Sequence, residues 1–369
     1  MRRVAFAAAA VLAAATGVFG VLAIAPFIFR QTTINPGPPI AVQPVPRLSP
    51  PASAPQVQPG VVAGKPPAKL APLEEARTAM VAFTNSAFPY AGLVPWKQSP
   101  FLDVTVGDLR GHSSGRLGGV YWEDKTYSDR SVLLSFPKHF DIRRPAVIVV
   151  FFHGNGATLG RDVVQRQRVA EQVAASGLNA ILVAPQFASD ALDSSAGNFW
   201  TPGFFARFLK EAASRLASLY GAGASPSVFE SMPVILVAYS GGYDPAAYSL
   251  AIGGTAPRRV MGLILLDALY GENEKFVNWI EKNLNSAFFV SAYSQSSARG
   301  NSIARASLAD HRIGFRESLP SELRPGTIAF LSAGADVDHG DFVTKAWVPL
   351  PLQSLLGKVP DYRAPPAVH

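Results

Sequence analysis

Ser240 lies at a point where the residue composition of the chain changes abruptly. Residues 234–239, with the sequence VILVAY, form an apolar run that has the length of a buried strand. Ser240 and two glycines follow, and then an alanine-rich stretch in which Pro245 can open a helix, since proline is tolerated in the first helical turn. A serine on so sharp a turn needs small residues two positions before and after it, and Ala238 and Gly242 meet that need. The pattern predicts a serine hydroxyl that is raised above a sheet and can act as a nucleophile.

Residues 238–242 resemble the G-x-S-x-G nucleophile elbow of the α/β-hydrolase superfamily, with alanine in the first place. The pentapeptide alone is a weak signal, and the alternative is a glycine-rich turn with an incidental serine. Its position after a strand-like run and before a helix strengthens it. The resemblance to the superfamily's fold covers roughly residues 100–359. The resemblance implies a serine hydrolase that forms an acyl-enzyme on Ser240 and needs no cofactor or metal.

The resemblance also implies an oxyanion hole made of two backbone N–H groups. One would belong to Gly241, directly after the serine. The other would come from His153-Gly154-Asn155-Gly156, at the end of an earlier strand-like run, with Asn155 as first choice and Gly156 as second. Glycines on both sides let this backbone approach a substrate closely. We expect His153 to belong to the structure of the loop rather than to act as the catalytic base.

The chain order that the resemblance implies is serine, acid, histidine, so the general base should follow the last strand. Of the six histidines, only His339 lies just after the final strand-like run and well before the end of the chain. The alternative is a polar histidine of a loop. In the catalytic role, its Nε2 would take the proton of Ser240 and return it to the leaving group.

The acid of the triad departs from the usual pattern. Its usual place, after residues 286–293, holds residues 294–297, Ser-Gln-Ser-Ser, with no carboxylate. The preceding strand-like run does end in Asp267, and a carboxylate in an apolar run is costly unless it has a strong partner. We therefore expect Asp267 to orient the histidine, with Asp336 and Asp338 as the alternatives.

Three aromatic residues are candidates for contact with the substrate. Trp200 and Phe187 lie in the long insertion at residues 187–205, and Tyr239 precedes the serine. They could wall an acyl or aryl pocket. Equally, the residues of the insertion could pack against the helix that follows it.

The elements needed to position these residues can be read from the alternation of the chain after residue 74. Continuous apolar runs indicate strands that are buried on both faces, and strands that alternate with helices indicate a parallel, doubly wound α/β sheet. Ligands of such sheets bind at the carboxyl ends of the strands. The predicted strands lie at residues 131–136, 146–152, 179–187, 233–239, 260–269, 286–293 and 327–334, and the predicted helices at 161–176, 203–220, 245–252 and 273–284.

The first 73 residues lack the alternation of strands and helices that is predicted for the rest of the chain. Residues 4–29 are 26 uncharged residues between basic ones, enough for a membrane anchor, and a cleaved signal peptide is the alternative. Residues 36–72 hold 12 prolines and read as an extended linker. The predicted divisions are an anchor or signal at 1–30, a linker at 31–73 and an α/β-hydrolase domain at 74–369. The domain is expected outside the cytoplasm, on the periplasmic side of the membrane if the chain is bacterial, or secreted if the segment is cleaved.

Composition narrows the chemistry further. The chain has no cysteine, which excludes disulfides, thiol nucleophiles and cysteine zinc sites. Of the net charge of +7, six positive charges precede Glu74 with no acidic residue among them, so a basic face for nucleic acid is not expected. Residues 154–160 imitate a dinucleotide loop but lack the acidic residue that would hold a ribose, and residues 336–341 fit a calcium loop poorly.

The expected function is therefore the hydrolysis of a small-molecule ester or another acyl substrate. Carboxylic esters are favoured by analogy with the superfamily. Two alternatives stay open at this point. One is a domain of the same fold that binds a component of the cell envelope without turnover, and the other is an amidase or peptidase that acts on cell-wall peptides.

Overall fold

The structure, a computed structural model, describes residues 70–115, 118–221 and 223–364. Within these ranges no helix has both the length and the apolar character that crossing a bilayer requires. The predicted anchor at residues 1–30 and nearly all of the predicted linker lie outside the described residues.

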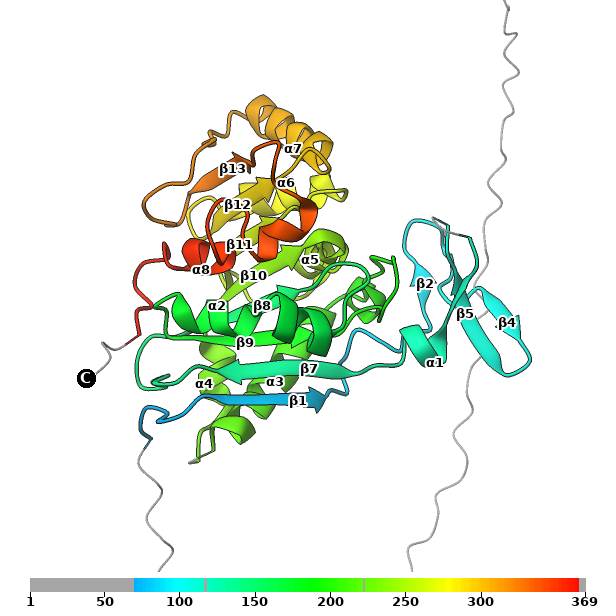
Figure 1. Cartoon of the computed structure of the whole chain (residues 1–369), viewed down its shortest axis with the longest axis horizontal. Coiled ribbons are helices and arrows are strands. Elements are labelled where there is room, and N and C mark those ends of the chain that lie inside the picture. Colours follow the sequence, from blue (N-terminus) through cyan, green and yellow to red (C-terminus); the bar gives the residue numbers. More distant parts are fainter. Residues whose placement is uncertain (1–69, 116–117, 222, 365–369) are drawn as a thin grey trace, which may run out of the picture. The chain divides into compact units, whose positions relative to one another are not determined.

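An eight-stranded sheet forms the centre of the fold, in the order β1-β7-β9-β8-β10-β11-β12-β13 (Figure 1). Six neighbouring strands run parallel to one another, namely β9, β8, β10, β11, β12 and β13. Strand β7 is antiparallel to both of its neighbours, β1 and β9. All seven predicted strands are confirmed, and the mostly parallel sheet fits the expected α/β-hydrolase-like fold. The strands are β1 (Arg77–Ala82), β7 (Ser131–Phe136), β8 (Val147–Phe152), β9 (Ala180–Pro185), β10 (Val234–Tyr239), β11 (Val260–Leu266), β12 (Phe288–Tyr293) and β13 (Ile328–Ser332).

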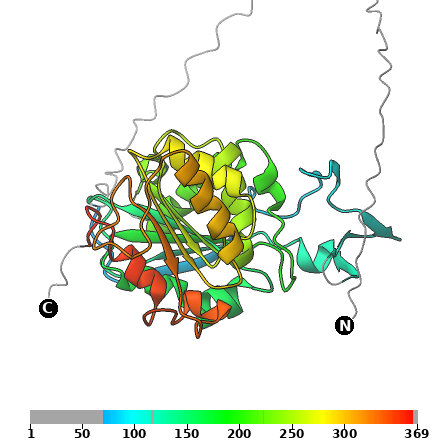
Figure 2. The same cartoon turned by 90° about the horizontal axis from the view of Figure 1, so that it is seen from above.

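Helices cover both faces of this sheet, as predicted. Figure 2 shows α7, in orange, and α8, in red, on opposite sides of it. The longer helical elements are η1 (Leu159–Arg166), α2 (Val169–Ala175), α3 (Phe204–Tyr220), α4 (Pro226–Ser231), α5 (Tyr243–Ile252), α6 (Asn273–Lys282), α7 (Ala298–Asp310) and α8 (Pro351–Leu356). The shorter ones are α1 (Glu123–Thr126), η2 (Gly197–Trp200), η3 (Ser240–Gly242) and η4 (His339–Val343).

The core consists of two apolar layers, one on each face of the sheet. Side chains alternate along each strand, so Ile148 and Val150 of β8 join one layer while Val147 and Val149 join the other. Both layers are fully buried at these positions, which explains why the strands are continuous apolar runs. Helices α3 to α7 pack on the first layer, and α2 and α8 pack on the second.

Two details differ from the sequence prediction. The predicted helix at 161–176 is divided into η1 and α2, because Arg168 between them adopts the left-handed conformation, with φ of 52°. The boundary at residue 74 is also too late for the packed unit, since Leu73 is buried in the core and donates its N–H to Phe140 O at 2.9 Å.

Short strands between β1 and β7 form two small sheets that the sequence analysis did not predict. One pairs β2 (Leu93–Val94) with β3 (Ser99–Pro100), and the other joins β4 (Val104–Val106), β5 (Leu109–Ser113) and β6 (Val120–Trp122). The second sheet touches the long insertion through Tyr121, whose hydroxyl accepts a hydrogen bond from the Leu192 N–H at 3.1 Å.

Candidate active site

Ser240 lies at the carboxyl end of β10, on the first residue of the short helix η3. Its φ is 53°, a left-handed conformation that costs a non-glycine residue about 1–3 kcal/mol. The backbone is closely packed two residues later, where a Cβ on Gly242 would lie 2.5 Å from Phe152 O and 3.1 Å from His153 O. Ala238, two residues before the serine, is fully buried. Both positions are therefore closely packed.

Three residues that are far apart in the sequence meet at this edge of the sheet. His339 begins η4 just after β13, and Asp267 follows the last residue of β11. His339 Nε2 lies 2.8 Å from Ser240 Oγ, and His339 Nδ1 lies 2.6 Å from Asp267 Oδ2. The structure thus joins the predicted nucleophile, base and acid in one line of hydrogen bonds.

The two alternative acids lie elsewhere. Asp338 forms a reciprocal cap with Asp341 at the start of η4, and it is exposed. Asp336 is also exposed, in the loop before that helix. Of the three candidate acids, Asp267 is the one that pairs with the imidazole of His339.

Asp267 is fully buried and is held by several donors besides the histidine. Its Oδ1 accepts from the Ser294 N–H at 2.9 Å and from the Ser297 hydroxyl, and its Oδ2 accepts from the hydroxyls of Ser294 at 2.8 Å and Ser296 at 2.9 Å. Burial by itself raises the pKa of the Asp267 carboxyl. The hydrogen bonds from His339, Ser297 and Ser294 outweigh burial and hold that pKa well below its usual range. The carboxylate therefore stays ionised.

These serines are functional candidates that the sequence analysis missed. They lie after β12, at the place where a carboxylate was looked for and not found. Hydroxyl groups can donate to a buried carboxylate that comes from the neighbouring strand. A run of serines at this position is therefore a signal that points to an acid at the end of β11.

Two tyrosines flank the imidazole of His339. The ring of Tyr239 stacks on it with centroids 5.1 Å apart, and the Tyr239 hydroxyl donates to His339 O at 3.3 Å. The ring of Tyr270 meets the imidazole at a steep angle, with its hydroxyl 3.4 Å from His339 Nδ1 and 2.7 Å from Ser296 Oγ. These contacts restrict the rotation of the imidazole, which must face both Ser240 and the acid.

The loop after β8 lies against the serine, since a Cβ on Gly154 would be 2.7 Å from Ser240 Cβ, and the two predicted donors of this loop differ in their partners. The Gly156 N–H donates to Ala191 O at 2.7 Å, so it is already engaged. The Asn155 N–H makes no backbone hydrogen bond within the described residues. The Gly241 N–H lies in the first turn of η3, where helix donors have no partner within the helix. Of the predicted oxyanion donors, Gly156 is thus the one whose N–H is engaged by another carbonyl.

A side chain at Gly241 would have to displace the side chains of Asn155 and Ser194. A Cβ at this position would overlap Oδ1 of Asn155, whose side chain packs against the turn. That same oxygen accepts the hydroxyl of Ser194 at 3.0 Å. Arg161 holds the loop from outside by donating to Gly156 O at 2.6 Å.

His153 is a structural residue of this loop in the geometry observed. It is buried, its Nδ1 lies 2.8 Å from Gly154 O, and its Nε2 accepts the Phe187 N–H at 2.9 Å. Burial lowers the pKa of His153, which keeps the ring neutral. Nδ1 then carries the proton and donates it to the Gly154 carbonyl.

A pocket of about 600 Å³ opens directly over Ser240. Apart from His339, no ionisable carboxylate or basic side chain lines it, although two tyrosines do. Its lining residues are Asn155, Leu192, Ser194, Ser240, Gly241, Tyr243, Tyr270, Ser296 and His339.

None of the three predicted substrate contacts lines this pocket. Phe187 and Trp200 are only 5% and 4% exposed and belong to the core layer under the insertion. Trp200 Nε1 donates to Asp244 Oδ2 at 2.8 Å, and the ring of Tyr239 packs against the imidazole of His339. The structure favours the packing alternative for the insertion's aromatic residues, while Leu192 and Ser194 of the same insertion reach the pocket.

Asp244 is a second buried carboxyl group close to the site, in the first turn of α5. Burial, and then the charge of Glu272, raise the pKa of Asp244 to about 8. Through Trp200 this residue ties the insertion to the helix that follows the serine.

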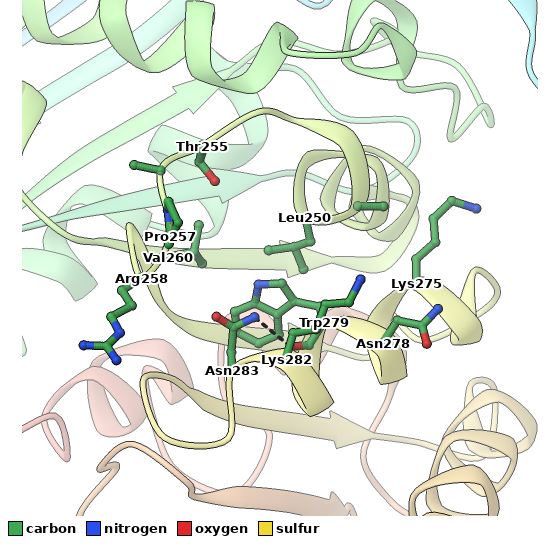
Figure 3. A pocket seen from close by; sticks show the side chains of 12 residues that line it. Leu250, Thr255, Pro257, Arg258, Val260, Lys275, Asn278, Trp279, Lys282 and Asn283 are labelled. Carbon is green, nitrogen blue, oxygen red and sulfur yellow. Dashed lines mark hydrogen bonds between the residues drawn. The ribbon is translucent and has the colours of Figure 1, made fainter.

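A further pocket of about 400 Å³ lies between the end of α5 and the side of α6 (Figure 3). Leu250 and Trp279 lie in its middle, with Arg258 on one side and Lys275 on the other. It shares no lining residue with the pocket over Ser240. Within the described ranges, no group of three or more histidine, aspartate or glutamate side chains could hold a metal ion.

The sequence matches no protein-family model and no curated protein. Among solved structures, the chain is similar to a mutant feruloyl esterase module from Clostridium thermocellum complexed with sinapinate. The identity is 15% and the TM-score 0.41, over 76% of this chain and 100% of that one. It is also similar to an S-formylglutathione hydrolase from Agrobacterium tumefaciens, at 12% identity and a TM-score of 0.35, over 65% and 92% of the two chains. It is similar as well to a truncated carbohydrate esterase from gut microbiota, with 9% identity and a TM-score of 0.37, over 78% of this chain and 96% of that one. Likenesses of this size assign no function.

Proposed function

We propose that this protein is a serine hydrolase of the α/β-hydrolase type that cleaves carboxylic esters through an acyl-enzyme on Ser240. The observation that carries the proposal is the line of hydrogen bonds from Asp267 through His339 to Ser240. The left-handed φ of Ser240 and the N–H groups of Asn155 and Gly241 support it, because a nucleophile on a sharp turn and two oxyanion donors suit acyl transfer.

In the first half of the reaction, Ser240 Oγ attacks the carbonyl carbon of the ester while His339 Nε2 takes the hydroxyl proton. The carbonyl oxygen becomes an oxyanion, which accepts hydrogen bonds from the N–H groups of Asn155 and Gly241. Each such donor contributes about 10²–10³-fold to the rate. The intermediate then expels the alkoxide, which takes the proton from His339 and leaves as the alcohol.

In the second half, water attacks the acyl-enzyme. His339 takes a proton from this water, and after the acid is released the proton is back on Ser240 Oγ. Asp267 accepts the His339 Nδ1–H throughout and stabilises the imidazolium. It can do so at neutral pH because its own pKa is held low.

The proposal includes a location outside the cytoplasm. It rests on the 26 uncharged residues 4–29 and the proline-rich segment after them, which suit an anchor or signal followed by a spacer. Fractionation of cells that produce the full chain tests this part, and recovery of all the protein in the cytosolic fraction contradicts it.

The activity is tested with a series of p-nitrophenyl esters of increasing acyl length. The wild-type protein should hydrolyse at least one of them, and Ser240→Ala should remove that activity while the melting temperature is unchanged. Matched anilides of the same acids decide between esterase and amidase. A wild-type protein that hydrolyses none of these substrates supports the non-catalytic alternative.

A further inference from the structure

A second pocket, of about 780 Å³, adjoins the pocket over Ser240. The two pockets share Ser296 and His339, whereas Ser240, Gly241 and Asn155 line only the first of them. The second pocket is bounded by the segment after β12, by α7 and by the loop between β13 and η4. Its lining residues are Tyr293, Ser294, Gln295, Ser296, Ala298, Ser302, Arg305, Ser332, Ala333, Gly334, Ala335, Val337, Asp338 and His339.

The chemistry of the proposed reaction assigns the two halves of an ester to these pockets. The acyl carbon must reach Ser240 Oγ, and its oxygen must reach the oxyanion donors, which lie in the first pocket. The leaving oxygen must instead come within reach of His339 Nε2, which returns the proton to it. An alcohol that extends past the imidazole enters the second pocket, because His339 lies at the junction of the two.

The lining of the second pocket shows which alcohol it suits. Gln295, Ser302 and Ser332 are exposed, and their side chains make no hydrogen bond within the described residues, so their polar groups can exchange water for a ligand. Arg305 Nε is buried and has no partner there either. A nonpolar chain packed over these groups would remove their water without replacing its hydrogen bonds, which is costly, whereas hydroxyl groups of a ligand can pair with them.

The charges in this pocket do not favour an anion or a cation. Arg305 is paired with Glu317, and Asp338 is occupied with the cap of η4. The remaining lining is made of small residues, Val337, one tyrosine ring and the imidazole of His339. A neutral ligand that carries several hydroxyl groups matches this mixture.

We propose that the second pocket binds the alcohol half of the substrate, and that this alcohol is a neutral polyhydroxylated one, such as a sugar or a polyol. The proposal rests on the proposed ester hydrolysis at Ser240 and adds a substrate class to it. Gln295, Ser302 and Ser332 determine specificity at this subsite by hydrogen bonding to the hydroxyl groups of the ligand.

The test compares esters of one acid with different alcohols. The acid is the one whose p-nitrophenyl ester gives the highest kcat/KM, and it is then esterified to hexanol, to glycerol and to the 6-hydroxyl of glucose. The glucose ester should exceed the hexyl ester in kcat/KM by about tenfold or more, since each hydrogen bond to a neutral group contributes about two- to tenfold. A hexyl ester that is hydrolysed as well as or better than the glucose ester overturns the proposal.

Two serines of helix α7 provide a matched pair of variants. Ser302→Ala should lower the ratio of kcat/KM for the glucose ester to that for the hexyl ester by about three- to tenfold. Ser307→Ala, in the same helix but outside the pocket, should leave this ratio unchanged. Equal ratios in wild type, Ser302→Ala and Ser332→Ala contradict the assignment of the pocket.

The failure of this proposal can be told from the failure of the proposed function. If a fluorophosphonate labels Ser240 and simple esters are hydrolysed, but the glucose ester has no advantage, the alcohol subsite is wrong and the ester hydrolase stands. If no ester is hydrolysed and no label is taken up, both are wrong.

Discussion

Asp267→Asn separates a catalytic role of the buried carboxylate from a structural one. The carboxylate accepts five hydrogen bonds, three from serine hydroxyls, one from the Ser294 N–H and one from His339 Nδ1. The single oxygen of an asparagine should stay opposite the Ser294 N–H, because a backbone donor cannot become an acceptor. The amide nitrogen then takes the place of Oδ2 and faces His339 Nδ1.

Two N–H groups cannot face each other, so the imidazole should move its proton from Nδ1 to Nε2. In that tautomer Nε2 cannot accept the proton of Ser240, and the imidazolium also loses its countercharge. The serine hydroxyls, by contrast, can rotate and accept from the amide. We therefore expect kcat to fall by about 10³–10⁴-fold, which corresponds to about 4–5.5 kcal/mol in the barrier. The melting temperature should change by no more than about 5 °C, because the weaker hydrogen bonds of a neutral amide are offset by the lost cost of burying a charge.

The assay is kcat on the best p-nitrophenyl ester, with a thermal melt of each protein. Asp336→Asn and Asp338→Asn are the controls, and each should keep kcat within about threefold of wild type, because neither residue pairs with the imidazole. If Asp267→Asn keeps most of the wild-type kcat while its melting temperature drops, Asp267 supports the sheet and the third member of the proposed triad is wrong.

Three further predictions concern the turn after Ser240, the packing of Leu73 and the titration of Asp244. Gly242→Val should lower both the melting temperature and the activity, because its Cβ would meet Phe152 O at 2.5 Å; a variant as stable as wild type removes the steric account of the turn. A chain that begins at Glu74 lacks the buried Leu73, so its free energy of unfolding should be about 1.5–3 kcal/mol lower than that of a chain that begins at Leu70. Equal melting curves of the two chains contradict this. The raised pKa of Asp244 means that the folded protein holds a proton which the unfolded chain releases, so stability should fall as the pH rises from about 4 to about 8. Asp244→Asn should flatten that part of a stability–pH curve, and an unchanged slope refutes the explanation.

Much of the fold can be predicted from the sequence because its strands are buried on both faces. β8 and β10 are continuous apolar runs with few other interpretations, and their bounds agree with the prediction to within one residue. The edge strand β1 was missed because it is partly exposed and pairs antiparallel, so its sequence RTAMVA has no long apolar run. The strands of the two small sheets have between two and five residues, too few for a periodic signal.

Some residues of the candidate site can likewise be predicted from local sequence, and others cannot. Ser240 and His339 could be placed because a turn with small neighbours and a histidine after the last strand are local features of the sequence. The hydroxyl groups that hold Asp267 could not, since serines of a loop after β12 become its partners only when the sheet brings two neighbouring strands together. The same limit applies to Gly156, whose N–H is engaged by a residue 35 positions later in the chain, Ala191.

The central claim is that Ser240 is a nucleophile activated by His339, and covalent capture tests it most directly. The protein is incubated with a fluorophosphonate, digested, and the modified peptide is identified by mass spectrometry. The account predicts one phosphonyl group per chain on Ser240, none on Ser240→Ala, and labelling of His339→Gln slowed by at least about a hundredfold. Wild-type protein that remains unlabelled while its melting curve shows it folded, or a label on any residue other than Ser240, contradicts the account.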